Sequence, residues 1–476
     1  MTFGSVLTYF QEIAAIPRPS KHEEQIRDYL RTFAETHGFS FVEDAAGNIC
    51  IRKPAYPGRE DAPGVVLQGH MDMVCEKDPG RAIDFTTDPI EVVAEDGWLT
   101  ARGTTLGADN GIGMALALDV LTSDVRCGPL ECLFTVDEET GMTGANSLEP
   151  GMVAGRLLIN LDSEEEGSIC TGCAGGIDTS AEIFYTRCPS PMDDIYYRLE
   201  VDGLVGGHSG TDIHLGRANA VKILTAFLRT VPRMVLCEMS GGNLRNAIPR
   251  HAFAVFGVPV SDTASVEAAF ARFSAAAAEQ YQTAEPNFSL SLLPESPNEC
   301  AIPKETADAL LAGLDACPHG VLAMSDAIPD LVQTSNNLAS VQTDAARILV
   351  TTLARSMVDR EKYEVAERVR QAFLPAGAVV VSSGDYPGWT PDQNSRLLKT
   401  AVSVYTGMFG TEPAITATHG GLECGLIGSK YPGMAMISIG PTIVGAHSPK
   451  ERLEIASVAR VRAYLAELLE RIGADA

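Results

Sequence analysis

Apolar residues recur along the chain in two alternating patterns, one with the period of a helix and one typical of buried strands. Helices are expected over 5–16 and 22–36, and the second ends at Gly38, a common helix C-cap. A hairpin at 39–53 follows. The next expected elements are strands at 64–69, 97–103, 130–136 and 156–161 and a helix at 111–122. Strands that alternate with helices indicate a layered α/β architecture.

The pattern changes near 174–195, where charge and proline accumulate, and a second α/β series then runs to about residue 384. Its expected elements are strands at 195–201 and 251–258 and helices at 263–280 and 360–373. The first style returns with a helix at 392–408, strands near 412–417 and 433–440, and a closing helix from about 450. We therefore predict one domain formed by 1–180 and 385–476 and interrupted by an inserted domain at 181–384.

Composition narrows the class of protein. The 476 residues have 45% hydrophobic and 21% charged content, which is ordinary for a globular protein. The net charge of −26 argues against nucleic acid or an anionic membrane as a partner, and is compatible with solubility alone or with a cation site. No segment reaches the roughly 18–20 apolar residues of a membrane span. The N-terminus lacks a basic region and carries Glu12, so no signal peptide is expected.

The eleven cysteines are spread through the chain without the density of a secreted disulfide scaffold. Cys170 and Cys173 form a C-x-x-C pair, but no second pair follows, so reduced thiols are favoured over a redox or zinc-knuckle site. Together with the missing signal peptide, this pattern predicts a cytoplasmic protein.

Candidate chemistry begins at LQGHMDMV (67–74), where an apolar strand ends. Side chains alternate along a strand, so His70 and Asp72 are expected on the same side of the sheet. For this pair alone, a surface loop with two polar residues is an equally good explanation.

Further acidic residues and a histidine stand at similar places. They are Asp109 in GTTLGADNGIG, Asp137, Glu138 and Glu139 in LFTVDEETG, Asp162 in LLINLDSEEEG, and His447 in GAHSPKE, directly before the last expected helix. Each has an ordinary explanation as a helix cap, a solvated acidic face or a structural histidine. Open α/β sheets, however, place ligands at the carboxyl ends of their strands, and clustered carboxylates repel one another unless a cation lies among them.

Two histidines and three carboxylates suit a pair of divalent ions, most simply zinc. Two such ions contribute four positive charges, which three carboxylates and one hydroxide would neutralise. We predict His70, Asp109, Glu139, Asp162 and His447 as ligands, with one carboxylate bridging the ions. Asp72 would then orient His70. The remaining Glu138 would act as general base toward the bridging water and then as general acid toward a leaving amine.

A whole set of motifs carries a resemblance to a known family. The motifs are GHMDMVCEK, TTLGADNGIG, TVDEETGM, INLDSEEEG with GCAGG, GGHSG, NAIPR, ARS, GLECG and AHSPKE. In this order, over about residues 5–470, they resemble the aminoacyl-histidine dipeptidases, the bacterial peptidase D group of di-zinc metallopeptidases related to peptidase T and the carboxypeptidase G type. The resemblance implies the same five ligands, with Asp109 as the bridge, Glu138 as the base and Asp72 as the support of His70.

The resemblance also implies an α/β catalytic domain with a mixed sheet, an inserted lid and dimerisation domain, two Zn²⁺ ions that Co²⁺ or Mn²⁺ can replace, and a homodimer. His208 of GGHSG resembles a histidine that stabilises the oxyanion, sometimes across a dimer, although a histidine between glycines is equally a flexible loop. Arg355 would bind a substrate carboxylate, or else form a surface ion pair. Asn246 resembles a substrate-contacting asparagine.

Two further residues complete the implied substrate site. Glu423 would receive a free α-amino group, or else is a structural carboxylate, and His419 shapes the pocket wall. Gly420 and Met357 depart from the family pattern near these positions, which bears on side-chain preference and leaves the hydrolytic mechanism untouched.

The function expected from the residues and the resemblance is hydrolysis of unblocked dipeptides, with Xaa-His dipeptides, carnosine-like ones included, as the preferred class. Two rivals remain. An N-acyl amino acid amidohydrolase of the same fold would not need a site for a free amine. A non-catalytic binding protein would not need the full ligand set together with Glu138, which this chain has.

Overall fold

The computed structural model describes residues 5–326 and 328–474, which divide into two compact units. Unit 1 comprises Met1–Gly172, Trp389–Ala417 and Leu422–Ala476, and unit 2 comprises Cys173–Gly388 and Thr418–Gly421. Unit 2 begins before the predicted residue 181 because strand β9 (Gly175–Phe184) pairs along its whole length with β20 (Arg347–Ser356) of the same unit. The short return at 418–421 has no counterpart among the predicted boundaries.

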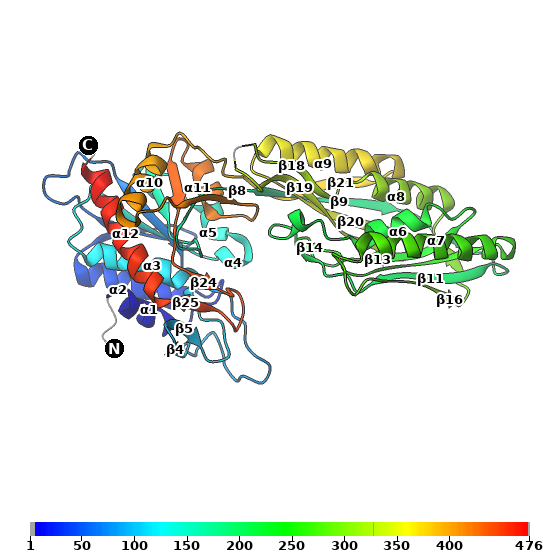
Figure 1. The fold of residues 1–476 in the computed structure, drawn as a ribbon, viewed down its shortest axis with the longest axis horizontal. Coiled ribbons are helices and arrows are strands. Elements are labelled where there is room, and N and C mark those ends of the chain that lie inside the picture. The colour runs from blue at the N-terminus through cyan, green and yellow to red at the C-terminus, as the bar shows by residue number, and fades with distance from the viewer. Residues whose placement is uncertain (1–4, 327, 475–476) are drawn as a thin grey trace. The chain divides into compact units, whose positions relative to one another are not determined.

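Unit 1 is built on an eight-stranded mixed sheet of order β1-β2-β6-β3-β7-β23-β8-β22. Figure 1 labels β8 of this sheet and several helices of the same unit. The strands are β1 (Ser40–Glu43), β2 (Ile49–Lys53), β3 (Val65–His70), β6 (Leu130–Thr135), β7 (Leu157–Asn160), β8 (Ser168–Cys173), β22 (Ala414–Thr418) and β23 (Ala435–Ser438). The central strand β3 runs parallel to both β6 and β7, and all six of its residues are buried. The mixed α/β fold class predicted from the sequence is therefore confirmed.

Helices enclose this sheet in a large apolar core. They are α1 (Ser5–Ala14), α2 (Glu24–His37), α3 (Ala108–Thr122), α4 (Glu138–Gly141), α5 (Thr143–Ser147), α10 (Arg396–Phe409), α11 (Glu423–Lys430) and α12 (Ile455–Ala474). Helix α3 is apolar on all sides and packs against α1 and β3. Helix α10 packs against α12. A helix that is hydrophobic all round belongs in an interior, and α3 is almost wholly buried.

A small second sheet in unit 1, of order β24-β25-β5-β4, corrects two sequence predictions. Its strands are β4 (Val92–Glu95), β5 (Trp98–Ala101), β24 (Ile443–Val444) and β25 (Arg452–Glu454). The closing helix, predicted from about 450, begins only at Ile455, because β25 precedes it and pairs with β5. His447 therefore lies in the loop between β24 and β25, not directly before the helix.

Unit 2 is built on a nine-stranded antiparallel sheet in which β16-β11-β15-β13-β19-β20-β9-β21 follow one another and β18 pairs with β19. Besides β9 and β20, the strands are β11 (Ile195–Asp202), β13 (Val235–Gly241), β15 (Ala252–Val258), β16 (Ser289–Glu295), β18 (Gly320–Met324), β19 (Val332–Thr343) and β21 (Val379–Tyr386). The helices are α6 (Ala220–Leu228), α7 (Thr263–Tyr281), α8 (Lys304–Ala316) and α9 (Asp359–Phe373). Two short ladders, β10 (Cys188–Pro189) with β17 (Cys300–Ala301) and β12 (Gly207–His208) with β14 (Ala247–Ile248), complete the unit. Among the residues that the structure describes, no helix is both long enough and apolar enough to cross a membrane.

Candidate active site

The end of strand β3 carries the first two predicted site residues, and both side chains are buried, with 1% of His70 and none of Asp72 exposed. Nδ1 of His70 lies 3.2 Å from the carbonyl oxygen of Asp72 and 3.3 Å from its carboxylate oxygen Oδ1. Because both oxygens can only accept, Nδ1 carries the proton. Nε2 of His70 faces the carboxylates of Asp109 and Asp162 and is the ring atom placed to bind a metal together with them.

Asp72 also holds the turn that bears two other predicted residues. Its Oδ1 accepts the backbone N–H of Glu138 at 3.0 Å, and its Oδ2 accepts the N–H of Glu139 at 3.2 Å and the hydroxyl of Ser20 at 2.8 Å. Burial tends to raise the pKa of Asp72, but the hydrogen bond and charge of His70 and these further donors lower it to about 2. Asp72 is therefore an ionised carboxylate that joins His70 to the Glu138–Glu139 turn.

Asp109 lies between the two predicted histidine ligands. It stands at the start of α3, where the chain departs from helical geometry and the Asp109–Asn110 peptide bond is cis. Its Oδ1 is 3.0 Å from Nε2 of His70, and its Oδ2 is 3.0 Å from Nε2 of His447. Burial opposes ionisation, but the hydrogen bonds to both histidines hold the pKa of Asp109 well below its usual range. A carboxylate with one oxygen toward each histidine has the placement of a bridging ligand.

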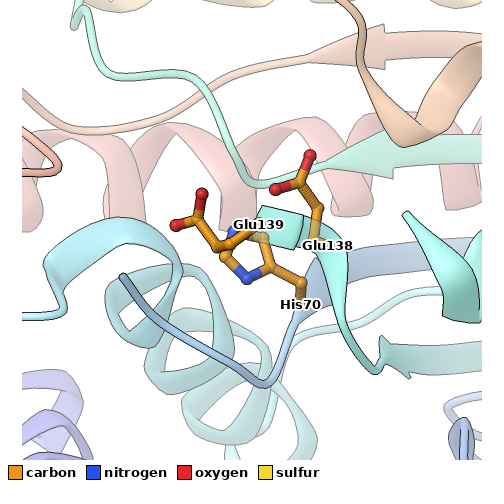
Figure 2. Close-up of side chains that lie close together, drawn as sticks. All are labelled: His70, Glu138 and Glu139. Carbon is orange, nitrogen blue, oxygen red and sulfur yellow. The ribbon is translucent and has the colours of Figure 1, made fainter. Parts of the chain in front are cut away.

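The three acids that follow strand β6 have different surroundings. The side chain of Asp137 accepts hydrogen bonds from the hydroxyls of Thr140 and Thr143, so Asp137 shapes the turn. Oε2 of Glu139 lies 3.1 Å from Nε2 of His447. Figure 2 shows Glu138 and Glu139 projecting from the same short turn beside His70. Burial raises the pKa of Glu138 well above its usual value, the charge of His70 opposes this, and the neighbouring carboxylates add to it.

Asp162 and His447 complete the predicted ligand set. Oδ1 of Asp162 lies 3.4 Å from Nε2 of His70, and burial, opposed by the charge of His70, raises the pKa of this carboxyl well above its usual value. His447 approaches from its loop with a half-exposed side chain. Hydrogen bonds to Asp109 and Glu139 raise the pKa of His447 to about 11.

The donor atoms fall into three overlapping groups that could hold a cation, each with its ligand atoms within 4.8 Å of one another. The groups are His70 with Glu138 and Glu139, His70 with Asp109 and Asp162, and Asp109 with Glu139 and His447. Oε1 of Glu139 and Oδ1 of Asp162 are buried without a hydrogen-bond partner. Unpartnered buried carboxylate oxygens beside imidazoles are the donor set that divalent transition ions bind. These residues therefore fit a metal site. Glu138, predicted as the base, belongs to the first of the groups.

Glu423 lies in unit 1 at the start of α11 and is 1% exposed. Its Oε2 accepts hydrogen bonds from Nε2 of Gln68 at 2.6 Å and from the hydroxyl of Thr135 at 2.7 Å, while its Oε1 has no partner. Burial, opposed by the charge of His70 and these hydrogen bonds, raises its pKa to about 7. Glu423 is therefore a buried carboxyl group that titrates near neutrality and keeps one acceptor unused.

The other predicted substrate-binding residues lie in unit 2. Arg355 is 5% exposed and takes part in none of the ion pairs found among the described residues. Its guanidinium donates to the hydroxyl of Tyr386 at 2.8 Å and lies 3.5 Å from Oγ of Ser209. Its hydrogen-bond partners are neutral, although its charge also acts on the nearby carboxyl group of Asp178. A buried guanidinium without a carboxylate hydrogen-bonded to it retains the capacity to bind an anion.

The charge of Arg355 acts on His208 and His419 of the same unit, whereas Asn246 is connected to it through Ser209. The N–H of Ser209 donates to the backbone oxygen of Asn246 at 2.7 Å, whereas the Asn246 side chain is exposed. Burial and the charge of Arg355 lower the pKa of His208. Nε2 of His419 lies 2.7 Å from Oγ of Ser335, and burial with the charge of Arg355 lowers the His419 pKa to about 3. Both shifts favour the neutral imidazole.

Sequence reasoning missed several residues that support this arrangement, chiefly Arg18 and Glu451 in unit 1 and Ser209, Ser335 and Tyr386 in unit 2. Glu451 stands inside the quoted motif AHSPKE, four positions after His447, which was the available signal. Ser209 likewise stands inside the quoted motif GGHSG, directly after His208. The other three carry no pattern that separates them from ordinary polar residues.

Comparison with known proteins identifies the family of this chain. The model of peptidase family M20/M25/M40 matches residues 66–471. The chain belongs to this family. Within it, the chain is 42% identical over 469 residues to the cytosol non-specific dipeptidase of Escherichia coli K12, covering 98% of this chain and 97% of that protein.

Solved structures of the M20 type agree. The aminoacylhistidine dipeptidase from Vibrio alginolyticus superposes with a TM-score of 0.91 at 41% identity, covering 98% of this chain and 96% of that one. The aminopeptidase PepT from Bacillus cereus matches with a TM-score of 0.59 at 16% identity over 98% of both chains, a likeness of fold alone.

Proposed function

We propose that this chain is a di-metal dipeptidase that hydrolyses unblocked dipeptides, with Xaa-His dipeptides, carnosine-like ones included, as its preferred class. The observation that carries the proposal is the position of Asp109, whose two carboxylate oxygens lie 3.0 Å from His70 and 3.0 Å from His447. The two relatives with about 40% identity over nearly the whole chain are a dipeptidase and an aminoacylhistidine dipeptidase, which supports the substrate class.

The proposed ligands are His70, Asp109, Glu139, Asp162 and His447, and the proposed metal is zinc, with Co²⁺ or Mn²⁺ as substitutes. When bound, two divalent ions supply polarisation of the scissile carbonyl and acidification of a water molecule. Neutralisation of the carboxylates by the ions also removes the repulsion that the buried cluster otherwise carries.

Glu138 is the proposed proton carrier. Its carboxylate takes a proton from the attacking water and later delivers it to the departing amine. Burial favours the protonated form of Glu138, so the carboxyl group holds the proton between these two transfers. Asp72 is a positioning residue, because it fixes both the ring of His70 and the backbone amide of Glu138.

Substrate recognition is proposed for residues that keep unused polar capacity. Arg355 binds the C-terminal carboxylate of the dipeptide through its guanidinium, and Glu423 receives the free α-amino group at its unpartnered Oε1. His208 is proposed to stabilise the oxyanion, Asn246 to contact substrate and His419 to shape the pocket wall. We also propose a cytoplasmic location, by analogy with the cytosolic relative, and a homodimer.

The test is amine release from Leu-His, β-alanyl-His and Ala-Leu, each beside its N-acetylated form, with zinc-reconstituted enzyme. We expect rapid cleavage of the free dipeptides, fastest for the histidine-containing ones, and no cleavage of the acetylated forms. Preferential cleavage of the acetylated forms would instead assign the chain to the N-acyl amino acid amidohydrolases. Cleavage of none of the six by metal-loaded enzyme would contradict hydrolysis of either kind.

A further inference from the structure

The loop that carries Asp109 is held by a carboxylate from a distant part of the chain. Oε2 of Glu451 accepts the backbone N–H groups of Leu106 at 2.8 Å and Gly107 at 3.0 Å. Oε1 of Glu451 accepts those of Ala108 at 2.8 Å and Asp109 at 3.2 Å. Four successive amides therefore point at one carboxylate, whose side chain is 2% exposed.

Local sequence cannot supply these hydrogen bonds. The first N–H groups of a helix lack partners within the helix and are usually satisfied by a side chain at the N-cap position. The N-cap of α3 is Gly107, which has no side chain and adopts a left-handed conformation with φ of 69°. Glu451 thus provides from outside the helix the acceptors that the N-cap residue lacks, and its negative charge suits the positive end of α3.

The loop is also fixed from its opposite side. The buried guanidinium of Arg18 donates to the backbone oxygens of Gly107 at 2.5 Å and Asp72 at 2.7 Å. The positive charge of Arg18 interacts favourably with the carboxylates of Asp72 and Glu451. The backbone amides of this loop are bound to the Glu451 carboxylate, and its Gly107 carbonyl is bound to the Arg18 guanidinium. The two contacts together hold the loop in place.

Glu451 and His447 lie in the same loop, between β24 and β25, and hydrogen bonds within this loop stabilise its conformation. The N–H of Glu451 donates to the backbone oxygen of Ser448 at 3.0 Å, and the hydroxyl of Ser448 donates to Gly445 at 2.7 Å. Position 445 requires glycine, since its φ is 74° and a Cβ there would lie 3.0 Å from the Lys450 oxygen. One side chain therefore couples the segments that carry two proposed metal ligands, Asp109 and His447.

We propose that Glu451 is a positioning residue for the metal centre, which sets the Asp109 carboxylate in place before any metal binds. This inference rests on the proposed di-metal site. Asp109 belongs to two of the three donor groups. A displaced Asp109 therefore weakens the binding of both ions. Loss of a side chain that orients a metal ligand generally lowers metal affinity by about 10- to 100-fold.

The first experiment compares zinc binding by wild type and Glu451→Gln, by chelator competition, with thermal unfolding of both metal-free proteins. The side-chain amide of the substituted glutamine retains one acceptor oxygen but turns an NH₂ group toward two of the backbone donors, at nearly unchanged side-chain volume. We expect at least about 10-fold weaker zinc binding for Glu451→Gln. Glu451→Asp, which keeps the charge, should recover part of the affinity.

The matched control is Glu285→Gln in unit 2. Glu285 is also a buried carboxylate that accepts two loop amides, those of Val205 at 2.6 Å and Ala218 at 2.8 Å. The Glu285→Gln variant should be destabilised to a similar degree as Glu451→Gln and should bind zinc like wild type. Equal zinc affinity of Glu451→Gln and Glu285→Gln would overturn the proposal, whereas failure of wild type to bind zinc would overturn the proposed function instead.

A second measurement needs no variant and applies even if Glu451→Gln does not fold. Hydrogen exchange of the metal-free wild-type protein should show the amides of 106–109 protected as strongly as in the zinc-loaded protein. Free exchange of these amides without metal would mean that the ions, and not Glu451, order the loop.

Discussion

The carboxylate of Asp72 accepts the backbone amide of Glu138 at 3.0 Å, although 66 residues separate them in sequence. Asp72 thereby links the strand end that carries His70 to the turn that carries the proposed general base. Its function is to hold two parts of the site in register through hydrogen bonds to the backbone, in addition to orienting one imidazole.

Asp72→Asn should lower zinc affinity or kcat/KM by about 10- to 100-fold. The amide cannot accept at both oxygen positions. Either His70 and Glu138, which share Oδ1, or Glu139, which uses Oδ2, therefore loses its acceptor. Ser20→Ala, which removes only the hydroxyl bonded to Oδ2, is the matched control and should have a much smaller effect. Steady-state kinetics with metal analysis measures both. Wild-type behaviour of Asp72→Asn would show that neither hydrogen bond matters for the site.

Glu138→Gln should reduce kcat by about 10²- to 10⁴-fold, the usual contribution of a general acid–base residue, while zinc content stays at the wild-type value. Glutamine has the same size and cannot carry the proton. Glu165→Gln, at an exposed glutamate of the same unit, should leave kcat unchanged. Because Glu138 also belongs to one donor group, loss of zinc from Glu138→Gln would reassign it as a ligand.

Metal removal should abolish activity and lower stability, since a ligand that binds only the folded state stabilises it. At a free zinc concentration 100 times Kd, that stabilisation is about 2.7 kcal/mol. Activity should return with Zn²⁺, and to different extents with Co²⁺ or Mn²⁺. Thermal unfolding with and without chelator gives the shift. Full activity after exhaustive chelation, with metal absent by elemental analysis, would refute the di-metal mechanism.

Arg355→Gln should raise KM for free dipeptides by roughly 10- to 100-fold, as expected for loss of a charge-assisted hydrogen bond, with a smaller change in kcat. Dipeptide amides lack the carboxylate, so their KM should respond little. Arg229→Gln is the matched control, because Arg229 is an exposed arginine of the same unit that pairs with Asp315. Equal effects of Arg355→Gln on acids and amides would argue against carboxylate binding.

Stability should fall as the pH falls from about 6.5 to about 4 because of His319 in unit 2. Burial, together with the charge of Lys222, lowers the pKa of His319 from 6.5 to about 4. Its Nδ1 lies 3.4 Å from Nδ2 of Asn219 and accepts the N–H of Leu338 at 3.3 Å, so protonation there would set donor against donor. The unfolded chain binds this proton below about pH 6.5, whereas the folded chain does so only near pH 4, and the stability lost between them is roughly 3 kcal/mol.

Urea unfolding of wild type and His319→Asn at pH 7, 6 and 5 measures this contribution. The substitution should reduce stability at pH 7 and flatten its dependence on pH. His214→Asn, at an exposed histidine of the same unit, should leave the slope as in wild type. An unchanged slope in His319→Asn would place the titrating group elsewhere.

Much of the fold could be predicted from local patterns. The predicted strand at 64–69 is β3 (Val65–His70) and the predicted helix at 263–280 is α7 (Thr263–Tyr281). The prediction failed where pairing is non-local and short: β25 has three residues and forms because β5 lies beside it, so the sequence was read as part of the last helix. The return of 418–421 to unit 2 was missed for the same reason, because it rests on hydrogen bonds from Ala174 to Thr418 and Gly420.

By itself, the sequence determined which residues are candidates for the chemistry. The hydrophobic pattern predicts where the apolar strands end, and acidic residues and histidines at those ends point to a cation. Only the tertiary structure decided what holds them. Glu451 serves Asp109 through amides 342 to 345 positions away, and Asp72 serves Glu138 in the same manner. The physical reason is that a backbone amide is present at every non-proline residue, so the sequence cannot mark which amides a buried carboxylate will meet. That choice is made when the chain is packed.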